Sequence, residues 1–258
     1  MKKSNIEKIN EKEKKRLLKE ENKKKKEELK REKKLLKEQE TEKKKQEKLK
    51  RKEEKEYEGI SHIYSWFGSL FTYQLSQAFY NFKLFNDENG INYYENSVNA
   101  SKTNFLYCKN LEKSYKTFST PSWGLTACDI PKGYSGELGT LPRGFKGDSY
   151  DYLIIRGTVA PTAAISSMPF IPDKSYEALI YYQSNRYICD EKYGLRDSFN
   201  LDYLGEEWYD NDFIGIDKGI EVLQLYNYIK TDFISNLSIN NPFVIEGFIN
   251  NDFVRGKN

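Results

Sequence analysis

Apolar residues follow a helical period over most of the chain beyond residue 58. Between residues 60 and 85 they recur every three or four positions, at Ile63, Trp66, Phe67, Leu70, Phe71, Leu75, Ala78, Phe79 and Phe82. This spacing gathers them into one broad stripe on a helix surface. The pattern predicts a helix that is buried over much of its surface.

Further helices are predicted over residues 91–110, 162–169, 172–188, 217–237 and 241–250. Pro172 with Asp173 marks a helix start, and Pro242 stands in the first turn of the last helix. Strand signals are confined to short pieces such as residues 152–155. We therefore expect a mainly α fold whose functional residues project from helix ends and from long, glycine-containing loops.

Residues 1–57 have a different pattern, with many Lys and Glu residues, few apolar ones, and neither Gly nor Pro. Such a composition predicts a long charged helix, partly frayed, or a disordered tail. The leucines do not hold the a/d spacing of a coiled coil, so only a weak coiled coil is an alternative. An arm for nucleic acid or an anionic surface is a further alternative, which the interspersed Glu residues weaken.

Charge and aromatic content divide the chain at the same place. Through Glu58 there are 25 basic residues and 16 acidic ones, a net charge of +9, whereas the remainder carries −6. Nearly all of the 20 Tyr, 15 Phe and 3 Trp lie in the remainder, which alone can bury a core. We expect two parts: a charged tail at 1–57 and one domain at 58–258.

Several classes of function are disfavoured by what the sequence contains. Cys108, Cys128 and Cys189 are an odd number without metal-ligand spacing, and a single histidine, His62, is interpreted as structural. No apolar run approaches the length of a membrane span, and no secretory signal is recognised at the start. We expect a cytoplasmic protein without a metal or other cofactor, a membrane span or a nucleic-acid partner.

Three acidic residues lie in short blocks of Gly, aromatic and small polar residues: Asp129 after Trp123-Gly124, Asp197 after Tyr193-Gly194, and Asp217 after Ile214-Gly215. Acids that loops carry on a rigid scaffold, beside aromatic rings, suit the hydrolysis of glycosidic bonds. Each acid also has a structural explanation. Asp129 and Asp217 could cap helices, and Asp197 could pair with Arg196.

Polar and aromatic residues near these acids are candidates for sugar binding. Arg196 and Asn200 could bond sugar hydroxyls, and four aromatic residues could stack on a sugar ring: Trp123, Tyr134, Trp208 and Tyr209.

At these blocks the chain resembles a known family, the glycoamylase-like domain of bacterial β-1,2-glucan hydrolases and related (α/α)6-barrel glycoside hydrolases. The resemblance covers about residues 60–253. Its motifs are Asn92-Tyr93-Tyr94-Glu95-Asn96-Ser97, Ser122-Trp123-Gly124-Leu125-Thr126-Ala127-Cys128-Asp129, Gly157-Thr158-Val159-Ala160-Pro161-Thr162-Ala163-Ala164, Met168-Pro169-Phe170-Ile171-Pro172, Tyr193-Gly194-Leu195-Arg196-Asp197-Ser198-Phe199-Asn200, Tyr209-Asp210-Asn211-Asp212-Phe213-Ile214-Gly215-Ile216-Asp217 and Asn240-Asn241-Pro242-Phe243.

The resemblance implies a sugar cleft at the mouth of a helical barrel and acidic catalysis without a metal. The chain departs from the family at Thr72, where an acid is usual, at Arg156, where Asp is usual, and at Lys218, where Gln is common. A block of helices that precedes the first motif in the family has no counterpart here, and the charged tail lacks the apolar face to replace it. We therefore expect a partial (α/α)6 barrel.

Three functions follow as hypotheses. The first is a glycoside hydrolase acting on β-glucan, expected to be β-1,2-linked, with two of Asp129, Asp197 and Asp217 as the catalytic pair. The second is a truncated, inactive member that binds an oligosaccharide or polysaccharide, or a second chain that completes the barrel. The third is an interaction protein whose working part is the charged tail at residues 1–57.

Overall fold

The computed structural model describes residues 30, 33, 37, 54–140 and 157–256. The chain divides into two compact units, Met1–Lys52 and Glu53–Asn258. In the first unit Lys30, Lys33 and Lys37 are helical and exposed. Three expectations lie outside the described residues: the rest of the predicted tail helix, the strand expected at residues 152–155 and the departure from the family at Arg156.

The end of the predicted tail is extended rather than helical. Residues Glu54–Tyr57 form strand β1, which pairs antiparallel with β2, Ile60–Ile63. Glu58 and Gly59 both have positive φ, at 50° and 79°, and make the tight turn that joins these strands. The Tyr57 ring packs edge-on against Tyr107, so the hairpin belongs to the second unit.

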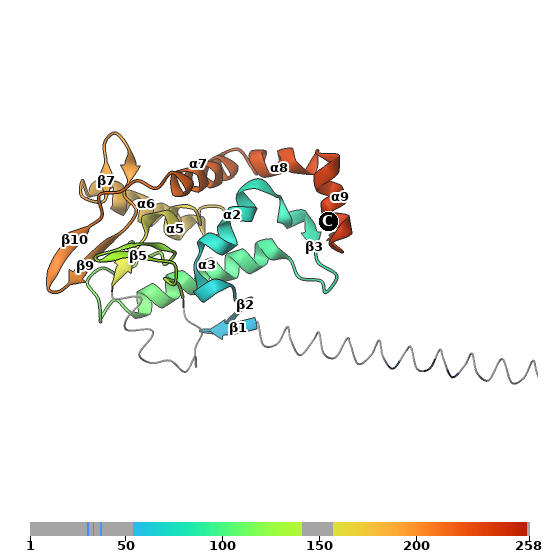
Figure 1. Cartoon of the computed structure of the whole chain (residues 1–258), viewed down its shortest axis with the longest axis horizontal. Helices are drawn as coiled ribbons and strands as arrows, with labels where there is room; N and C mark the ends of the chain where they lie inside the picture. Colours follow the sequence, from blue (N-terminus) through green and yellow to red (C-terminus); the bar gives the residue numbers. More distant parts are fainter. Residues whose placement is uncertain (1–29, 31–32, 34–36, 38–53, 141–156, 257–258) are drawn as a thin grey trace, which may run out of the picture. The chain divides into compact units, whose positions relative to one another are not determined.

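The second unit is mainly helical, as the sequence predicts (Figure 1). Its helices are α2 (Phe71–Phe79), α3 (Tyr93–Asn110), α5 (Pro161–Ile165), α6 (Pro172–Ser184), α7 (Gly215–Ile229), α8 (Phe233–Ile239) and α9 (Pro242–Asn250). Helix α2 packs against α3, α7 and α8, and α5 packs against α6 and α7. The ring of a partial (α/α)6 barrel stays a prediction.

The helix expected over residues 60–85 is much shorter than its apolar stripe. Its first residues form β2 and a short 3-10 turn, η1 (Trp66–Gly68), and a second turn, η2 (Phe82–Leu84), follows α2. Phe67 and Gly68 have positive φ, which ends helical geometry there. A Cβ on Gly68 would lie 2.2 Å from the carbonyl oxygen of Thr140, so the packing of the next loop requires glycine.

Short strands, unlike the helices, were largely missed by the sequence pattern. They are β3 (Phe85–Asn86), β4 (Cys128–Ile130), β5 (Gly133–Ser135), β6 (Thr158–Val159), β7 (Cys189–Asp190), β8 (Gly194–Leu195), β9 (Phe199–Tyr203), β10 (Glu206–Tyr209) and β11 (Val254–Arg255). They pair as β4–β5, β7–β8, β11–β3 and the three-stranded order β10–β9–β6. Strands of two to five residues are too short for a clear alternation of apolar and polar positions.

The core lies where α3, α5 and α6 meet the loop before β4. Trp123, Tyr182 and Phe199 are fully buried there. The Tyr182 hydroxyl donates to the carbonyl oxygen of Trp123 at 2.6 Å and accepts from its N–H at 2.9 Å. This pair of hydrogen bonds fixes the backbone from which β4 starts. Within the described part of the chain, no helix has the length and apolar character needed to cross a membrane.

Candidate active site

The structure brings Asp129, Asp197 and Asp217 together at one place. Asp129 lies in β4, Asp197 in the loop between β8 and β9, and Asp217 in the first turn of α7. One carboxylate oxygen of Asp197 accepts the backbone N–H of Asp129 at 2.6 Å. The Asp217 side chain lies beside that of Asp197 and raises its pKa. Acids 68 and 20 residues apart in sequence thus form one cluster.

The backbone around Asp129 is held from two sides. Gly124, which directly follows Trp123, has φ +128°, and a Cβ there would lie 2.8 Å from the carbonyl oxygen of Ala160. On the other side, the Thr126 hydroxyl shares a 2.8 Å hydrogen bond with Ser69. The loop therefore enters β4 in a fixed geometry, which a catalytic carboxylate requires.

Asp197 is the central residue of the cluster and exposes only 3% of its surface. Its backbone N–H donates to the carbonyl oxygen of Asp212 at 3.0 Å, and the neighbouring Ser198 hydroxyl donates to that of Asp129 at 2.5 Å. The pKa of Asp197 is raised to about 8, mainly by burial. The hydrogen bond from the Asp129 N–H lowers this pKa, whereas the nearby Asp217 carboxyl raises it. Asp197 is therefore largely protonated at neutral pH.

Asp217 does not cap its helix, although it stands in the first turn. Ile214 occupies the N-cap position of α7, and the Asp217 side chain is 6% exposed. Burial raises its pKa as well, while the hydrogen bond with Asp197 and the charge of Lys218 lower it. The two carboxyl groups are close enough to shift each other's pKa, so ionising both at once is unfavourable.

A fourth acid, Asp210, joins the cluster and was missed by the sequence analysis. One oxygen of each of Asp129, Asp197 and Asp210 lies within 4.8 Å of the others. Burial raises the pKa of Asp129, and the charges of Asp210 and Asp212 raise it further. Three oxygens at this spacing could hold a metal ion. The available signal was the position of Asp210 directly after β10, inside a motif that was already quoted.

Arg196 holds the loop that carries Asp210. Its guanidinium donates to the backbone oxygen of Asp210 at 3.1 Å and to the side-chain oxygen of Asn211 at 3.0 Å, and it lies 5.4 Å from the centre of the Phe213 ring. The simple ion pair with Asp197 that the sequence allowed is replaced by these contacts. Binding of a sugar by Arg196 stays a prediction.

Two of the predicted sugar contacts are inside the protein. Trp123 is 0% exposed, and its ring packs edge-on against Phe105, so it has no free face for a sugar. Asn200 is 1% exposed; its amide donates to Thr158 at 3.0 Å, and its oxygen accepts the N–H of Asp202 at 2.8 Å. Both residues support the site from within the core. Their assignment as sugar-contacting residues is not supported by these positions.

Three other aromatic candidates keep accessible surface. Tyr134 is 68% exposed and stands opposite Asp129 in the β4–β5 pair. The Tyr134 pKa is raised by burial and then by the nearby Cys128, Asp197, Asp217 and Asp129, so its phenol is electrostatically linked to the cluster. Trp208 and Tyr209 are half-buried in β10, and the Tyr209 ring stacks on Tyr187. Of these, Tyr134 has the position of a sugar platform beside the acids.

The remaining titratable groups that the sequence singled out lie deeper. His62 is buried beside the Tyr73 ring, and burial lowers its pKa to about 4, so it is neutral at pH 7.

Cys108, Cys128 and Cys189 are free thiols. Burial raises the pKa of Cys128 well above its usual value, and the charge of Asp197 adds to this effect. A protonated thiol is a poor nucleophile.

The family model described as "Putative glucoamylase" matches residues 41–242, so the chain belongs to the glycoamylase family. This match confirms the family resemblance stated from the sequence motifs.

Relatives agree with the family assignment. An exo-β-1,2-glucooligosaccharide sophorohydrolase (non-reducing end) of Parabacteroides distasonis is 32% identical over 157 residues, 60% of this chain and 20% of the relative. A putative glucoamylase of Bacteroides fragilis superposes with a TM-score of 0.67 at 27% identity, over 79% of this chain and 46% of its own. An endo-β-1,2-glucanase of Chitinophaga pinensis, solved with sophorotriose and glucose, gives 0.66 at 28% identity, over 78% and 46%. The chain therefore spans less than half the length of these relatives.

Proposed function

We propose that this protein is a glycoside hydrolase that acts on β-glucan, with β-1,2-linked glucose as the substrate. The convergence of Asp129, Asp197 and Asp217 on one point carries the proposal. The substrate class rests on the relatives, among which are a β-1,2-glucooligosaccharide hydrolase and a β-1,2-glucanase.

The environments of the acids suit different roles. Asp197 keeps a proton at neutral pH, as a general acid must, because it is buried beside the carboxyl group of Asp217. Asp129 is half-buried and stands opposite the exposed Tyr134, so it is the carboxylate placed to meet the sugar. Asp217 acts through Asp197 and is a positioning residue. Glycosidases use such a division between a protonated and an ionised carboxyl.

Hydrolysis of linear β-1,2-glucan tests the proposal. The full chain is expected to release glucose oligosaccharides, and Asp129→Asn or Asp197→Asn should lower the rate by about 10²-fold or more, because loss of an acid or base group typically costs this much. Asp252→Asn is the matched control: Asp252 is exposed, and its φ of 59° suits asparagine.

The result that contradicts the proposal is a cooperatively folded chain that binds the glucan without any release of sugar. Equal loss of activity in Asp252→Asn would also count against a specific role of the cluster.

A second candidate is binding to a second body of helices that completes the fold, with or without turnover. The specific observation is the inverted polarity of α7. Its buried residues include Asp217, Glu221, Gln224 and Asn227, while Val222 and Ile229 are 65% and 67% exposed. A helix that buries its polar face and exposes its apolar one is typical of an interface.

A further inference from the structure

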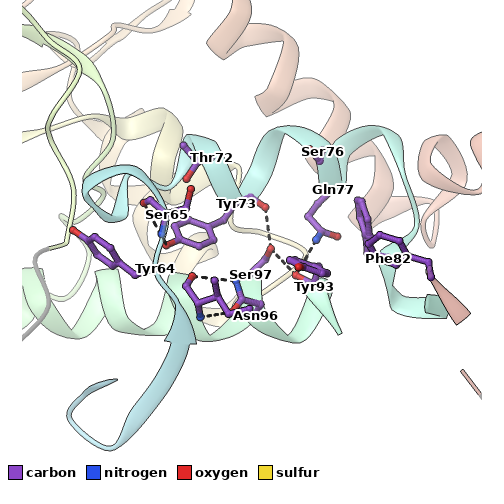
Figure 2. Close-up of a pocket in the computed structure, with 12 residues that line it drawn as sticks. Tyr64, Ser65, Thr72, Tyr73, Ser76, Gln77, Phe82, Tyr93, Asn96 and Ser97 are labelled. Atoms are coloured by element: carbon purple, nitrogen blue, oxygen red, sulfur yellow. Dashed lines mark hydrogen bonds between the residues drawn. The ribbon is translucent and has the colours of Figure 1, made fainter. Parts of the chain in front are cut away.

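A pocket separate from the acid cluster lies between α2, α3 and β2 (Figure 2). It has a volume of about 500 Å³, which is within the range of small-molecule sites. In Figure 2 the Tyr73 ring points from α2 toward Ser65, whose N–H its hydroxyl accepts, and the Gln77 amide points toward Tyr93 on α3. None of the four clustered acids lines this pocket.

The chemistry of the lining restricts the ligand. Among its twelve described residues five are Tyr or Phe, six are Ser, Thr, Asn or Gln, one is Ile63, and none is charged at neutral pH. Burial raises the pKa of Tyr73, so this phenol stays neutral. Such a lining offers nothing to neutralise a phosphate, a carboxylate or an ammonium group, which excludes charged ligands. Aromatic rings with neutral polar groups are the lining that a saccharide needs.

Hydrogen bonds fix the walls of the pocket. The Asn96 side chain accepts the N–H of Ile63 at 2.7 Å, and the Ser97 hydroxyl bridges to the backbone oxygens of Tyr73 and Tyr93, each at 2.9 Å. The amide of Gln77 donates to the oxygen of Tyr93, also at 2.9 Å. Walls that are already in place lose little conformational entropy when a ligand binds.

Polar groups for the ligand remain on the α2 side. The Thr72 hydroxyl donates its proton to the backbone oxygen of Ser69 at 2.8 Å and keeps acceptor capacity, and Thr72 and Ser76 are both exposed. Gln77 uses its amide nitrogen for the wall, and its side-chain oxygen can accept from a sugar hydroxyl. Thr72 and Ser76 lie one turn apart on α2, Gln77 follows Ser76, and all three line the same pocket.

We propose that this pocket is an accessory site for a neutral saccharide, one or two glucose units of a β-glucan chain. The choice of glucan rests on the proposed function, whereas the neutral polar and aromatic lining stands by itself. Helix α2 connects the two sites: Ser69, at its start, accepts the N–H of Ala127 at 3.1 Å, two residues before Asp129. Such a site would hold a glucan chain while its scissile bond lies at the acids.

The test measures binding of a β-1,2-linked glucose disaccharide to the full chain carrying Asp129→Asn, so that hydrolysis does not remove the ligand. Backbone amide hydrogen exchange reports where it binds. Protection is expected in α2 and at the start of α3. Adding Ser76→Phe, which fills the pocket from an exposed helical position, should weaken this protection roughly tenfold or more. Adding Thr72→Val instead should weaken it to a smaller degree.

Ser184→Phe is the matched control, because Ser184 is exposed at the end of α6 and outside the pocket. The proposal is overturned if the disaccharide gives no protection in α2 and α3, or if Ser76→Phe and Thr72→Val both leave it unchanged. Failure of catalysis alone does not affect this readout. With Asp129 intact, Ser76→Phe should leave hydrolysis of a short oligosaccharide unchanged and raise the KM for long glucan.

Discussion

At the scale of single residues, the acids could be named from the sequence but their protonation states could not. Asp129, Asp197 and Asp217 each had a simple structural explanation, as a cap or an ion pair. The structure replaces these with a shared arrangement in which Asp197 accepts the N–H of Asp129 and lies beside Asp217. Burial of two carboxyl groups in contact, which depends on the whole fold, raises the pKa of Asp197 to about 8.

The raised pKa predicts a pH dependence of stability. Between the unfolded value of 3.8 and the folded value of about 8, the folded state binds a proton at Asp197 that the unfolded state has lost. The free energy of unfolding therefore falls as pH rises through this range, by linkage. Asp197→Asn mimics the protonated form and removes this contribution.

Thermal melting of the two proteins from pH 5 to pH 8 measures the effect. The Tm of Asp197→Asn minus that of the wild type should become more positive as pH rises. A difference that stays constant over this range would show that Asp197 is ionised in the folded protein.

At the scale of elements, the strongest helical patterns located helices but not their limits. Helix α3 begins and ends near the expected residues, because Asn92 caps it by accepting the N–H groups of Tyr94 and Glu95 at 3.0 Å each. The helix expected over 217–237 is divided into α7 and α8 at Thr231 and Asp232, both with positive φ. Asp232 is paired there with Lys83 at 2.8 Å, a contact invisible to local periodicity.

Helix α7 also shows that an apolar stripe does not identify the buried face. Gln224 donates to the backbone oxygen of Gln74 at 2.8 Å, and Asn227 donates to that of Ala78 at 3.0 Å, so polar residues fix α7 against α2. The apolar positions Val222, Tyr226 and Ile229 are left outside with the spacing of a helix–helix contact.

Two isoleucines of α7 provide a matched test of this orientation. Ile220 is 3% exposed and Ile229 is 67% exposed. Ile220→Ala should lower the free energy of unfolding by about 2–4 kcal/mol, because it leaves a cavity. Ile229→Ala should change it by less than about 0.5 kcal/mol in the isolated chain. Denaturant unfolding measures both values; equal losses would mean that the outer face of α7 is already covered.

At the scale of the whole molecule, the chain belongs to the glycoamylase family while it spans less than half the length of its solved relatives. Its exposed apolar residues continue from α7 onto α8 and α9, where Phe233, Leu237 and Phe243 are 48%, 55% and 81% exposed. In Figure 1, α7 and α8 follow one another along the top of the second unit, and α9 turns downward after them. We propose that the second body of helices contacts these exposed residues.

Complementation tests this placement. The part of the Bacteroides fragilis relative that has no counterpart in this chain supplies a candidate second body. Mixing it with the full chain is expected to raise hydrolysis of β-1,2-glucan, and Val222→Glu with Ile229→Glu should abolish the gain, because charged side chains would be buried. Glu112→Lys, at an exposed position after α3 and outside α7, α8 and α9, is a charge control. A gain that survives the two substitutions on α7 would place the contact elsewhere.

The sequence by itself determined the family, the mainly helical class and the three acids, because motif residues and helical periodicity are local and survive without knowledge of contacts. Tertiary structure alone decided that Asp210 joins the cluster, that Trp123 and Asn200 lie in the core, and that α7 turns its apolar face outward. These properties depend on which distant segments meet, and one sequence does not contain the distances between them.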